Sequence, residues 1–224
     1  MTKNRDFIKL YIADVSALKN QELYDLAYGS VSPARRKKTD NLKQPNDKCL
    51  SLGAGCLLNY ALATENISNY KITYGEHGKP ELDCGLNISI SHSGKYALCA
   101  ISDHAVGCDI EKVDTANLKV AKRFFTEREY EMLTSAGDDM DTLFYRLWTM
   151  KESLIKLTGL GISQALDSFE IDVRKGSTLY NDIIYHFYEY EIDDNYRCSA
   201  CNDASCSATL ISVDLKNDIL FSLY

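Results

Sequence analysis

Two acidic residues near the middle of the chain have the spacing of a metal-binding pair. They are Asp109 and Glu111 in the segment GCDIEK (107–112), which we predict to lie on a β-strand. Because side chains alternate along a strand, both carboxylates share one face, about 7 Å apart by the usual rise per residue. Two such groups can converge on one hard cation, and oxygen ligands favour Mg²⁺ or Mn²⁺ over zinc. An exposed strand face would explain these residues equally well.

A third acid and a lysine follow in the segment WTMKESLIK (148–156), whose spacing is helical. Glu152 and Lys156 are four residues apart and therefore adjoin on one face of a helix. An ordinary surface ion pair has the same spacing. If the segment meets the acidic pair, however, Glu152 supplies a third oxygen ligand or a base, and Lys156 lies over a phosphate. Three acids and a lysine suit a metal–pyrophosphate site.

A histidine lies between two serines in the segment NISISHSG (87–94). A serine hydrolase would need a Gly-x-Ser-x-Gly turn, which does not accompany it. Ser91, His92 and the amides of the following turn are better suited to binding a phosphate, although a histidine at a strand end is often only structural. The turn Gly78-Lys79-Pro80 is not a P-loop, and by itself it presents a solvated lysine.

Strands and helices that could position these residues are expected in both halves of the chain. We predict strands at 9–15, 70–74, 86–91, 96–102, 106–113, 168–173, 183–192 and 198–213. We predict helices at 16–27, from Ser32-Pro33, at 49–64, around 121–125, from a capping box at 126–129, and at 141–157. This order indicates an α+β fold rather than strict β-α alternation. It permits two related subdomains, residues 1–105 and 106–224.

The composition fits a globular protein and excludes one broad class. With 224 residues, 45% of them hydrophobic, the chain can bury one sizeable core or two small ones. A net charge of −7 argues against a general nucleic-acid binder. Residues 1–107 carry 13 basic and 11 acidic side chains, and residues 108–224 carry 12 and 21. One half could thus bind anionic groups and the other a metal, although scattered surface charge is an alternative.

Neither export nor membrane insertion is indicated. The first residues lack the uncharged apolar run of a secretory signal, and the uncharged stretch 49–64 is too short and polar to span a bilayer. We therefore expect a cytoplasmic protein without a membrane partner. Cys198, Cys201 and Cys206 resemble part of a zinc site, but no fourth ligand follows at a suitable spacing, so buried thiols are favoured.

Taken in order, these segments resemble the 4′-phosphopantetheinyl transferase superfamily, specifically its larger, Sfp-type members. The matching stretches are Tyr74 to Pro80, NISISHSG (87–94), GCDIEK (107–112), AKRFFT (121–126) and WTMKESLIK (148–156). The resemblance implies two similar α+β subdomains related by pseudo-twofold symmetry. It also implies Mg²⁺-dependent transfer of 4′-phosphopantetheine from coenzyme A to a serine of an acyl, peptidyl or polyketide carrier protein, with release of adenosine 3′,5′-bisphosphate. Mn²⁺ could replace Mg²⁺.

The resemblance also assigns roles to individual residues. Asp109, Glu111 and Glu152 would hold the metal, Glu152 would deprotonate the carrier serine, and Lys156 would contact the pyrophosphate. Ser91, His92 and Lys79 would contact coenzyme A phosphates, and Arg35 and Lys38, in the basic cluster after Pro33, would contact the 3′-phosphate. The carrier would dock near Lys112, 119–123 and the helix from Thr126.

Two other functions are alternatives to the transferase. A metal-dependent nucleotide pyrophosphatase would employ the three acids with water as the nucleophile. A coenzyme A-binding or carrier-binding module without catalysis would not need Asp109, Glu111, Glu152 and Lys156 together. A monomer is expected if two subdomains of one chain complete the site, and the sequence does not indicate which carrier is used.

Overall fold

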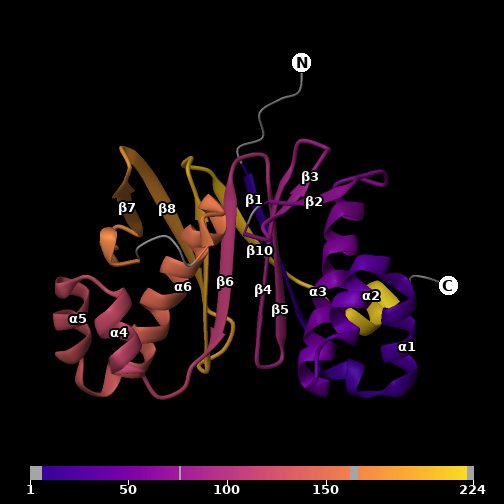
Figure 1. Cartoon of the computed structure of the whole chain (residues 1–224), viewed down its shortest axis with the longest axis horizontal. Coiled ribbons are helices and arrows are strands. Elements are labelled where there is room, and N and C mark those ends of the chain that lie inside the picture. The colour runs from indigo at the N-terminus through magenta and orange to yellow at the C-terminus, as the bar shows by residue number, and fades with distance from the viewer. Residues whose placement is uncertain (1–6, 76, 162–165, 221–224) are drawn as a thin grey trace.

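Two four-stranded sheets lie side by side in the middle of the molecule, each covered by a long helix on its outer side (Figure 1). This computed structural model describes residues 7–75, 77–161 and 166–220. The first sheet has the strand order β10-β1-β5-β4 and the second β6-β9-β8-β7, while β2 and β3 form a separate hairpin. The fold is therefore mixed α+β, as predicted.

The two halves repeat one order of elements. The first half contains β1 (Phe7–Asp14), a 3-10 turn (Val15–Lys19), α1 (Gln21–Ser30), α2 (Pro33–Asp40), α3 (Pro45–Thr64), β2 (Ile72–Tyr74), β3 (Pro80–Leu82), β4 (Asn87–Ser93) and β5 (Tyr96–Ser102). The second contains β6 (Val106–Lys112), α4 (Leu118–Phe124), α5 (Glu127–Thr134), α6 (Met140–Thr158), β7 (Ser177–Tyr180), β8 (Ile183–Tyr190) and β9 (Tyr196–Asn202). The antiparallel groups β1-β5-β4 and β6-β9-β8 correspond, so the chain contains two similar subdomains.

Local capping explains where several helices begin and end. The Ser32 side chain accepts from the Arg35 amide, with Pro33 as the first helical residue of α2. At α5 the predicted capping box is present, because Thr126 and Glu129 bond each other's backbone amides. Gly159, with φ 70°, ends α6 in the left-handed conformation.

Three predicted elements were wrong in extent or type. The helix expected at 16–27 is interrupted at Asn20, whose side chain caps α1 by accepting from the Leu23 amide. Segment 168–173 is not a strand: its pairing with β7 is limited to the isolated bridge between Asp172 and Ser177. Side chains bond the backbone before that bridge, where the Ile171 amide donates to Glu129 and the Phe169 carbonyl accepts from Lys151. The expected strand 198–213 is two strands, β9 and β10, separated by a turn.

The last strand returns to the first sheet. β10 (Ser207–Ser212) pairs in parallel with β1, and Val213, Leu215 and Leu220 then join the core of the first half. Residues 207–220 thus cross back over the sheet junction. We retain the boundary between 105 and 106 as a proposal for the point where the chain passes from one sheet to the other.

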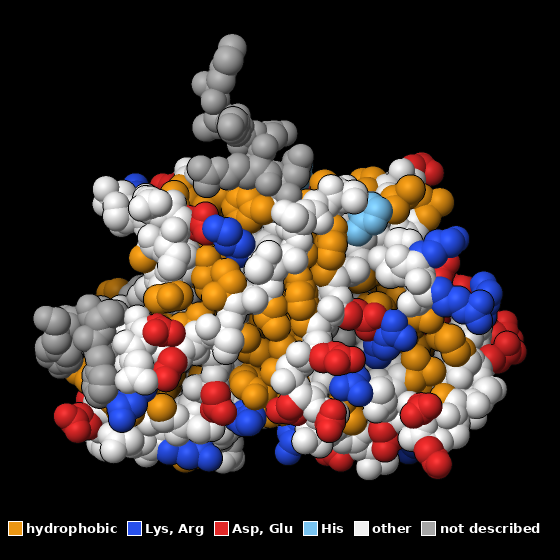
Figure 2. All heavy atoms as spheres, turned by 180° about the vertical axis from the view of Figure 1, so that it is seen from behind, with side chains coloured by type: hydrophobic (Ala, Val, Ile, Leu, Met, Phe, Trp, Pro, Cys, Tyr) orange, Lys and Arg blue, Asp and Glu red, His pale blue; other side chains and the backbone are white. Residues whose placement is uncertain are grey.

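The described residues form three apolar cores. One lies between the first sheet and α3, another between the second sheet and α6, and the third between the two sheets. In Figure 2 apolar side chains gather down the middle of the rear face, with charged side chains on both sides. Within the described residues, no helix has the length and apolar character needed to cross a bilayer. The shared third core couples the positions of the two halves.

Candidate active site

A cavity of about 600 Å³ opens where the two halves meet. Its walls come from α2, the β2–β3 turn, β4, β6 and the C-terminal part of α6. The lining residues include Arg35, Lys38, Tyr74, His77, Lys79, Ser91, His92, Asp109, Glu111, Glu152 and Lys156. All the candidate site residues predicted from the sequence therefore border one cavity, although they come from segments more than 100 residues apart.

The backbone of β6 approaches α6 unusually closely beneath this cavity. A Cβ atom added to Gly107 would lie 1.8 Å from the Ser153 carbonyl oxygen and 2.5 Å from the Leu157 amide nitrogen. Only glycine permits this contact. Because strand side chains alternate, Asp109 and Glu111 project on the same side as Gly107, toward α6, while Cys108 and Ile110 enter the core between the sheets.

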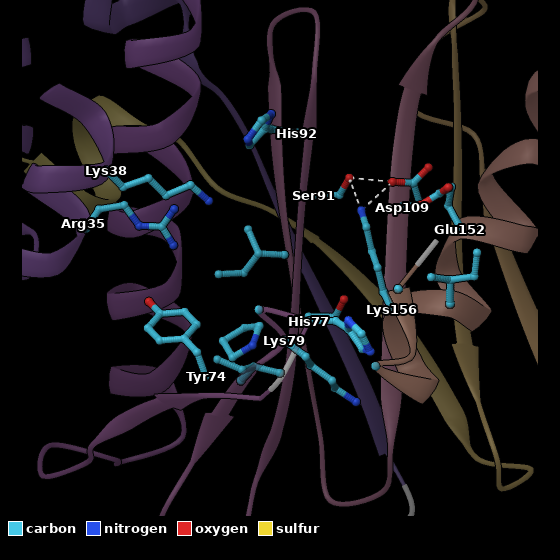
Figure 3. Close-up of a pocket in the computed structure, with 18 of the residues that line it drawn as sticks. Arg35, Lys38, Tyr74, His77, Lys79, Ser91, His92, Asp109, Glu152 and Lys156 are labelled. Atoms are coloured by element: carbon cyan, nitrogen blue, oxygen red, sulfur yellow. Dashed lines mark hydrogen bonds and ion pairs between the residues drawn. The ribbon is translucent and has the colours of Figure 1, made fainter. Parts of the chain in front are cut away.

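Lys156, Asp109 and Ser91 form a closed triangle of hydrogen bonds (Figure 3). Lys156 Nζ donates to Asp109 Oδ1 at 2.6 Å and to Ser91 Oγ at 2.8 Å. The Ser91 hydroxyl donates to the same Asp109 oxygen at 2.7 Å and accepts from the Ile110 amide at 3.4 Å. The single proton and both lone pairs of Ser91 are therefore in use.

The acidic wall carries charge that its surroundings stabilise incompletely. Burial, followed by the Asp109 charge, raises the pKa of Glu111 from its ordinary 4.5 to about 7. The same two causes raise the pKa of Glu152. Asp109 Oδ2 is buried and finds no hydrogen-bond partner in the part of the chain that the structure describes. A buried unpaired carboxylate oxygen is costly unless a proton or cation meets it.

These residues fit a divalent hard cation. Carboxylate oxygens are the donors that Mg²⁺ and Mn²⁺ prefer, and Asp109 Oδ2 offers an uncommitted one. No three His, Cys, Asp or Glu side chains are gathered closely enough to hold an ion by themselves among residues 7–75, 77–161 and 166–220. Mg²⁺ usually binds one or two carboxylates together with substrate phosphate oxygens, so a site completed by its substrate needs no such preformed cluster.

The opposite wall is basic. In Figure 3 Arg35 and Lys38 extend from α2 toward the cavity, across from Asp109 and Lys156. Burial lowers the pKa of Arg35, and burial and the Arg35 charge lower the pKa of Lys38. For His92, burial and then the charges of Lys156 and Lys38 lower the pKa below its ordinary 6.5. Positive groups that disfavour one another's charge would gain from a bound anion.

Lys79 joins the hairpin of the first half to the long helix of the second. Its Nζ donates to the Leu157 carbonyl oxygen at 2.5 Å, near the C-terminus of α6, where a positive charge is favoured. Gly159 lies against the Lys79 side chain, and Gly161 against His77. Glu76 of the predicted turn lies outside the described residues. Lys79 thus borders the cavity while bonding the opposite half of the molecule.

Sequence reasoning did not single out several residues of this region. Ser93 donates to Glu111 Oε2 at 2.8 Å, and Tyr74 and His77 line the cavity. The i, i+2 repeat of serines at 89, 91 and 93 is the signal that could have identified Ser93, since all three must share one face of a strand. Tyr74 and His77 fall within the matching stretch Tyr74 to Pro80, but no role was predicted for either of them.

The cysteine group lies away from this cavity. Cys198 and Cys201 are buried thiols on β9, as predicted, and Cys206 is half-buried before β10. Cys198 belongs to the core between the sheets and Cys201 to the core under α6. Because their side chains enter opposite faces of one sheet, these two thiols cannot share a metal ion.

Comparisons with known proteins agree on one family. The profile described as the 4′-phosphopantetheinyl transferase superfamily matches residues 105–201. The 4′-phosphopantetheinyl transferase gsp of Aneurinibacillus migulanus is 36% identical over 184 residues, covering 77% of this chain and 76% of that protein. The 4′-phosphopantetheinyl transferase Sfp of Bacillus subtilis is 29% identical over 205 residues, 87% of this chain and 92% of that protein. A Thermotoga maritima holo-[acyl-carrier-protein] synthase structure has a TM-score of 0.35 and 16% identity, covering 43% of this chain and 61% of that chain.

Proposed function

The chain belongs to the 4′-phosphopantetheinyl transferase superfamily and is an enzyme of that class. We propose that it transfers 4′-phosphopantetheine from coenzyme A to a carrier-protein serine in a Mg²⁺-dependent reaction. The observation that carries the proposal is the cavity between the two halves, with Arg35 and Lys38 on one wall and the acids on the other, where Lys156 bonds Asp109. An anionic ligand and a cation can occupy such a site together.

The phosphates of coenzyme A would lie along the basic wall. We assign Arg35 and Lys38 to the 3′-phosphate, and Ser91, His92 and Lys79 to the remaining phosphate groups. Lys156 would contact the pyrophosphate, since its ammonium group borders the cavity beside Asp109. The lowered pKa values of Arg35, Lys38 and His92 support this assignment, because burial disfavours the charged form of all three and neighbouring positive charges add to this for Lys38 and His92, so that a bound phosphate would favour their charged forms.

Asp109, Glu111 and Glu152 would hold the metal ion, for which Mn²⁺ is an alternative to Mg²⁺. When bound, the ion supplies positive charge to the pyrophosphate oxygens as negative charge develops on the leaving group. Side chains of the protein orient two of these acids: Ser91 and Lys156 bond Asp109, and Ser93 bonds Glu111.

Glu152 is our candidate for the base that takes the proton of the carrier serine, directly or through water. The serine oxygen forms a bond to the phosphorus that carries the pantetheine arm, while the bond from that phosphorus to the bridging oxygen breaks. The bridging oxygen leaves on adenosine 3′,5′-bisphosphate. A raised pKa, as Glu152 has, makes a carboxylate a better proton acceptor near neutral pH. Positioning and electrostatic stabilisation suffice for this chemistry, so no covalent enzyme intermediate is required.

The test is to incubate the chain with coenzyme A, Mg²⁺ and an apo carrier protein and then weigh the carrier by mass spectrometry. A gain equal to one phosphopantetheine group, absent when a chelator removes the metal, supports the proposal. Breakdown of coenzyme A without labelling of any carrier would instead indicate a pyrophosphatase. Fatty-acid, polyketide and nonribosomal-peptide carriers tested side by side would identify the acceptor.

A further inference from the structure

Three serine hydroxyls join the two sheets where no backbone pairing connects them in the described parts of the chain. β4 is the edge strand of the first sheet and β6 the edge strand of the second. The amides of Cys108 and Lys112 donate to the hydroxyls of Ser89 and Ser93, each at 3.0 Å, and the Ile110 amide donates to Ser91 at 3.4 Å. We call Ser89, Ser91 and Ser93 the serine ladder.

The spacing of the serine ladder follows from strand geometry. Serines two residues apart on β4 share one face, and every second amide of β6 points toward the open edge of its sheet. Each hydroxyl therefore meets one amide that would otherwise be an unpaired edge donor. Side chains replace a backbone ladder at the junction between the two halves.

Two members of the serine ladder also bond the acids of the cavity. While accepting from β6 amides, Ser91 donates to Asp109 Oδ1 at 2.7 Å and Ser93 donates to Glu111 Oε2 at 2.8 Å. A hydroxyl has one proton, so each of these two serines directs it to a carboxylate. Ser89 differs, because the described hydrogen bond of its hydroxyl is to the Cys108 amide and not to an acid.

The turn after Ser93 is fixed from the second sheet. Gly94 has φ 59°, and a Cβ atom added to it would lie 2.1 Å from the Tyr196 hydroxyl, which accepts from the Lys95 amide at 3.1 Å. The Asn46 side chain donates to the Gly94 carbonyl at 3.1 Å. Ser93 therefore has little freedom to follow a displaced carboxylate, and it can impose a direction on Glu111.

We propose that Ser93 is a positioning residue for the acidic wall: its hydroxyl fixes one oxygen of Glu111 and ties the direction of that carboxylate to the junction between the two halves. This inference rests on the proposed function, because it assumes that Glu111 takes part in holding a divalent cation. The structural observation is that one hydroxyl bonds both a backbone amide and a carboxylate of β6.

The test measures metal binding as well as transfer. Mn²⁺ is titrated into the full chain in the presence of coenzyme A, and the free ion is followed by electron paramagnetic resonance, with coenzyme A alone as the blank. We expect Ser93→Ala to raise the Kd for Mn²⁺ about tenfold, as loss of a bond that orients a metal ligand commonly does. Ser93→Thr keeps the hydroxyl and should remain close to the wild type.

Ser89→Ala is the matched control, because it removes a hydroxyl of the same ladder that makes no described bond to an acid. Thermal unfolding should show a similar loss of stability in Ser89→Ala and Ser93→Ala, while only the latter weakens Mn²⁺ binding. If Ser93→Ala fails to fold, Ser93→Cys replaces it in the comparison of Mn²⁺ affinity, because a thiol has a similar volume but donates a weaker hydrogen bond to Glu111.

The outcomes separate this inference from the proposed function. Wild-type Mn²⁺ affinity in Ser93→Ala, or equal weakening in Ser89→Ala, overturns the role of Ser93 while leaving the transferase intact. A wild-type chain that binds no Mn²⁺ and labels no carrier overturns the proposed function and the inference together. Additive effects of Ser93→Ala and Glu111→Gln on Mn²⁺ affinity would also count against the inference, because a residue acting through Glu111 cannot add to its loss.

Discussion

At the scale of single residues, the cavity contains carboxylates whose charge is incompletely neutralised. Lys156 bonds only one oxygen of Asp109, and the other oxygen is buried without a partner among the described residues. Burial and the charge of Asp109 raise the pKa values of Glu111 and Glu152. This arrangement costs stability in the free chain, and a bound cation would recover it.

Replacing the most buried of the three cavity acids gives the first prediction. Asp109→Asn keeps the shape of the side chain and removes its charge, so transfer should fall on the order of 10²-fold or more in kcat/KM, as loss of a group that stabilises transition-state charge does. Carrier labelling at several Mg²⁺ concentrations measures this. Asp138→Asn, an exposed acid beyond α5, is the control and should behave as wild type. Full activity of Asp109→Asn with Mg²⁺ present would contradict the metal assignment.

The pKa of Glu111 predicts how metal binding depends on pH. The pKa of Glu111 is about 7 in the folded chain and 4.5 in its ordinary state. Between pH 4.5 and pH 7, Glu111 is therefore protonated in the folded chain and ionised in the unfolded chain. Its contribution to stability therefore falls as pH rises through that window, and a cation must displace the proton below pH 7. We expect Mg²⁺ to raise Tm more at pH 8 than at pH 6. Equal shifts at both pH values would contradict this.

At the scale of elements, the acids depend on how closely α6 lies over β6. Gly107→Ala would force a methyl group against the Ser153 carbonyl and the Leu157 amide, which are backbone atoms of α6 and cannot move aside singly. We expect a loss of about 3 kcal/mol in the free energy of unfolding, measured by urea denaturation. Gly29→Ala in α1 is the control: nothing lies within 4 Å of its added Cβ, so it should be neutral or stabilising. A stable Gly107→Ala would mean that the two elements are further apart.

A buried ion pair holds α5 against α6 next to Glu152. Lys151 and Glu129 are 0% and 1% exposed with 2.8 Å between Nζ and Oε2, and Glu129 also accepts from the Thr126 and Ile171 amides. Lys151→Met should cost about 3–5 kcal/mol, because it leaves a buried carboxylate unpaired. Urea denaturation of the single variant and of the double variant with Glu129→Gln tests this.

The double variant is expected to recover part of that loss, since the side chain introduced by Glu129→Gln carries no charge, and its carbonyl oxygen can still accept a backbone hydrogen bond. Arg128→Met removes an ion pair to Glu170 whose arginine is 82% exposed, and it should cost less than about 1 kcal/mol. If Lys151→Met cost no more than Arg128→Met, the buried pair would not be what fixes α5 to α6.

The sequence predicted elements well where local signals decide them and poorly where distant contacts do. The capping box at Thr126, the start of α2 and the end of α6 at Gly159 depend on neighbouring residues and were correct. Segment 168–173 has the alternating Phe, Ile and Val of a strand, but its pairing with β7 stops at one bridge, and Glu129 and Lys151 bond the rest of its backbone through their side chains. No local pattern can report a side chain that lies in a separate, distant element of the chain.

At the scale of the whole molecule, the cavity exists because two similar halves face each other across a shared core. The motif resemblance predicted which residues would face the cavity. It did not predict that β10 would return to β1, or that the serine ladder would join β4 to β6, because both depend on how the halves are placed. Those contacts fix the distance between the basic and acidic walls.

The same arrangement leaves α4 as a basic surface on the half that carries the acids. Lys119, Lys122 and Arg123 are exposed on this helix, which lies with α5 beside α6 (Figure 1). If the acceptor is an acidic carrier protein, as the resemblance implies, charge complementarity would steer it to α4. An ordinary solvated helix face would contribute nothing to carrier binding.

Charge reversal on α4 distinguishes these two cases. Lys122→Glu and Arg123→Glu together should raise the KM for the carrier about tenfold or more, because they remove the electrostatic attraction between α4 and an acidic carrier. The KM for the carrier should then depend less on salt concentration. KM for coenzyme A should not change, since both residues lie outside the cavity. Lys19→Glu, an exposed lysine of the other half, is the control and should leave both KM values as in wild type. An unchanged carrier KM in the α4 variant would place the docking surface elsewhere, and a parallel rise for coenzyme A would indicate that the substitutions disturb the cavity itself.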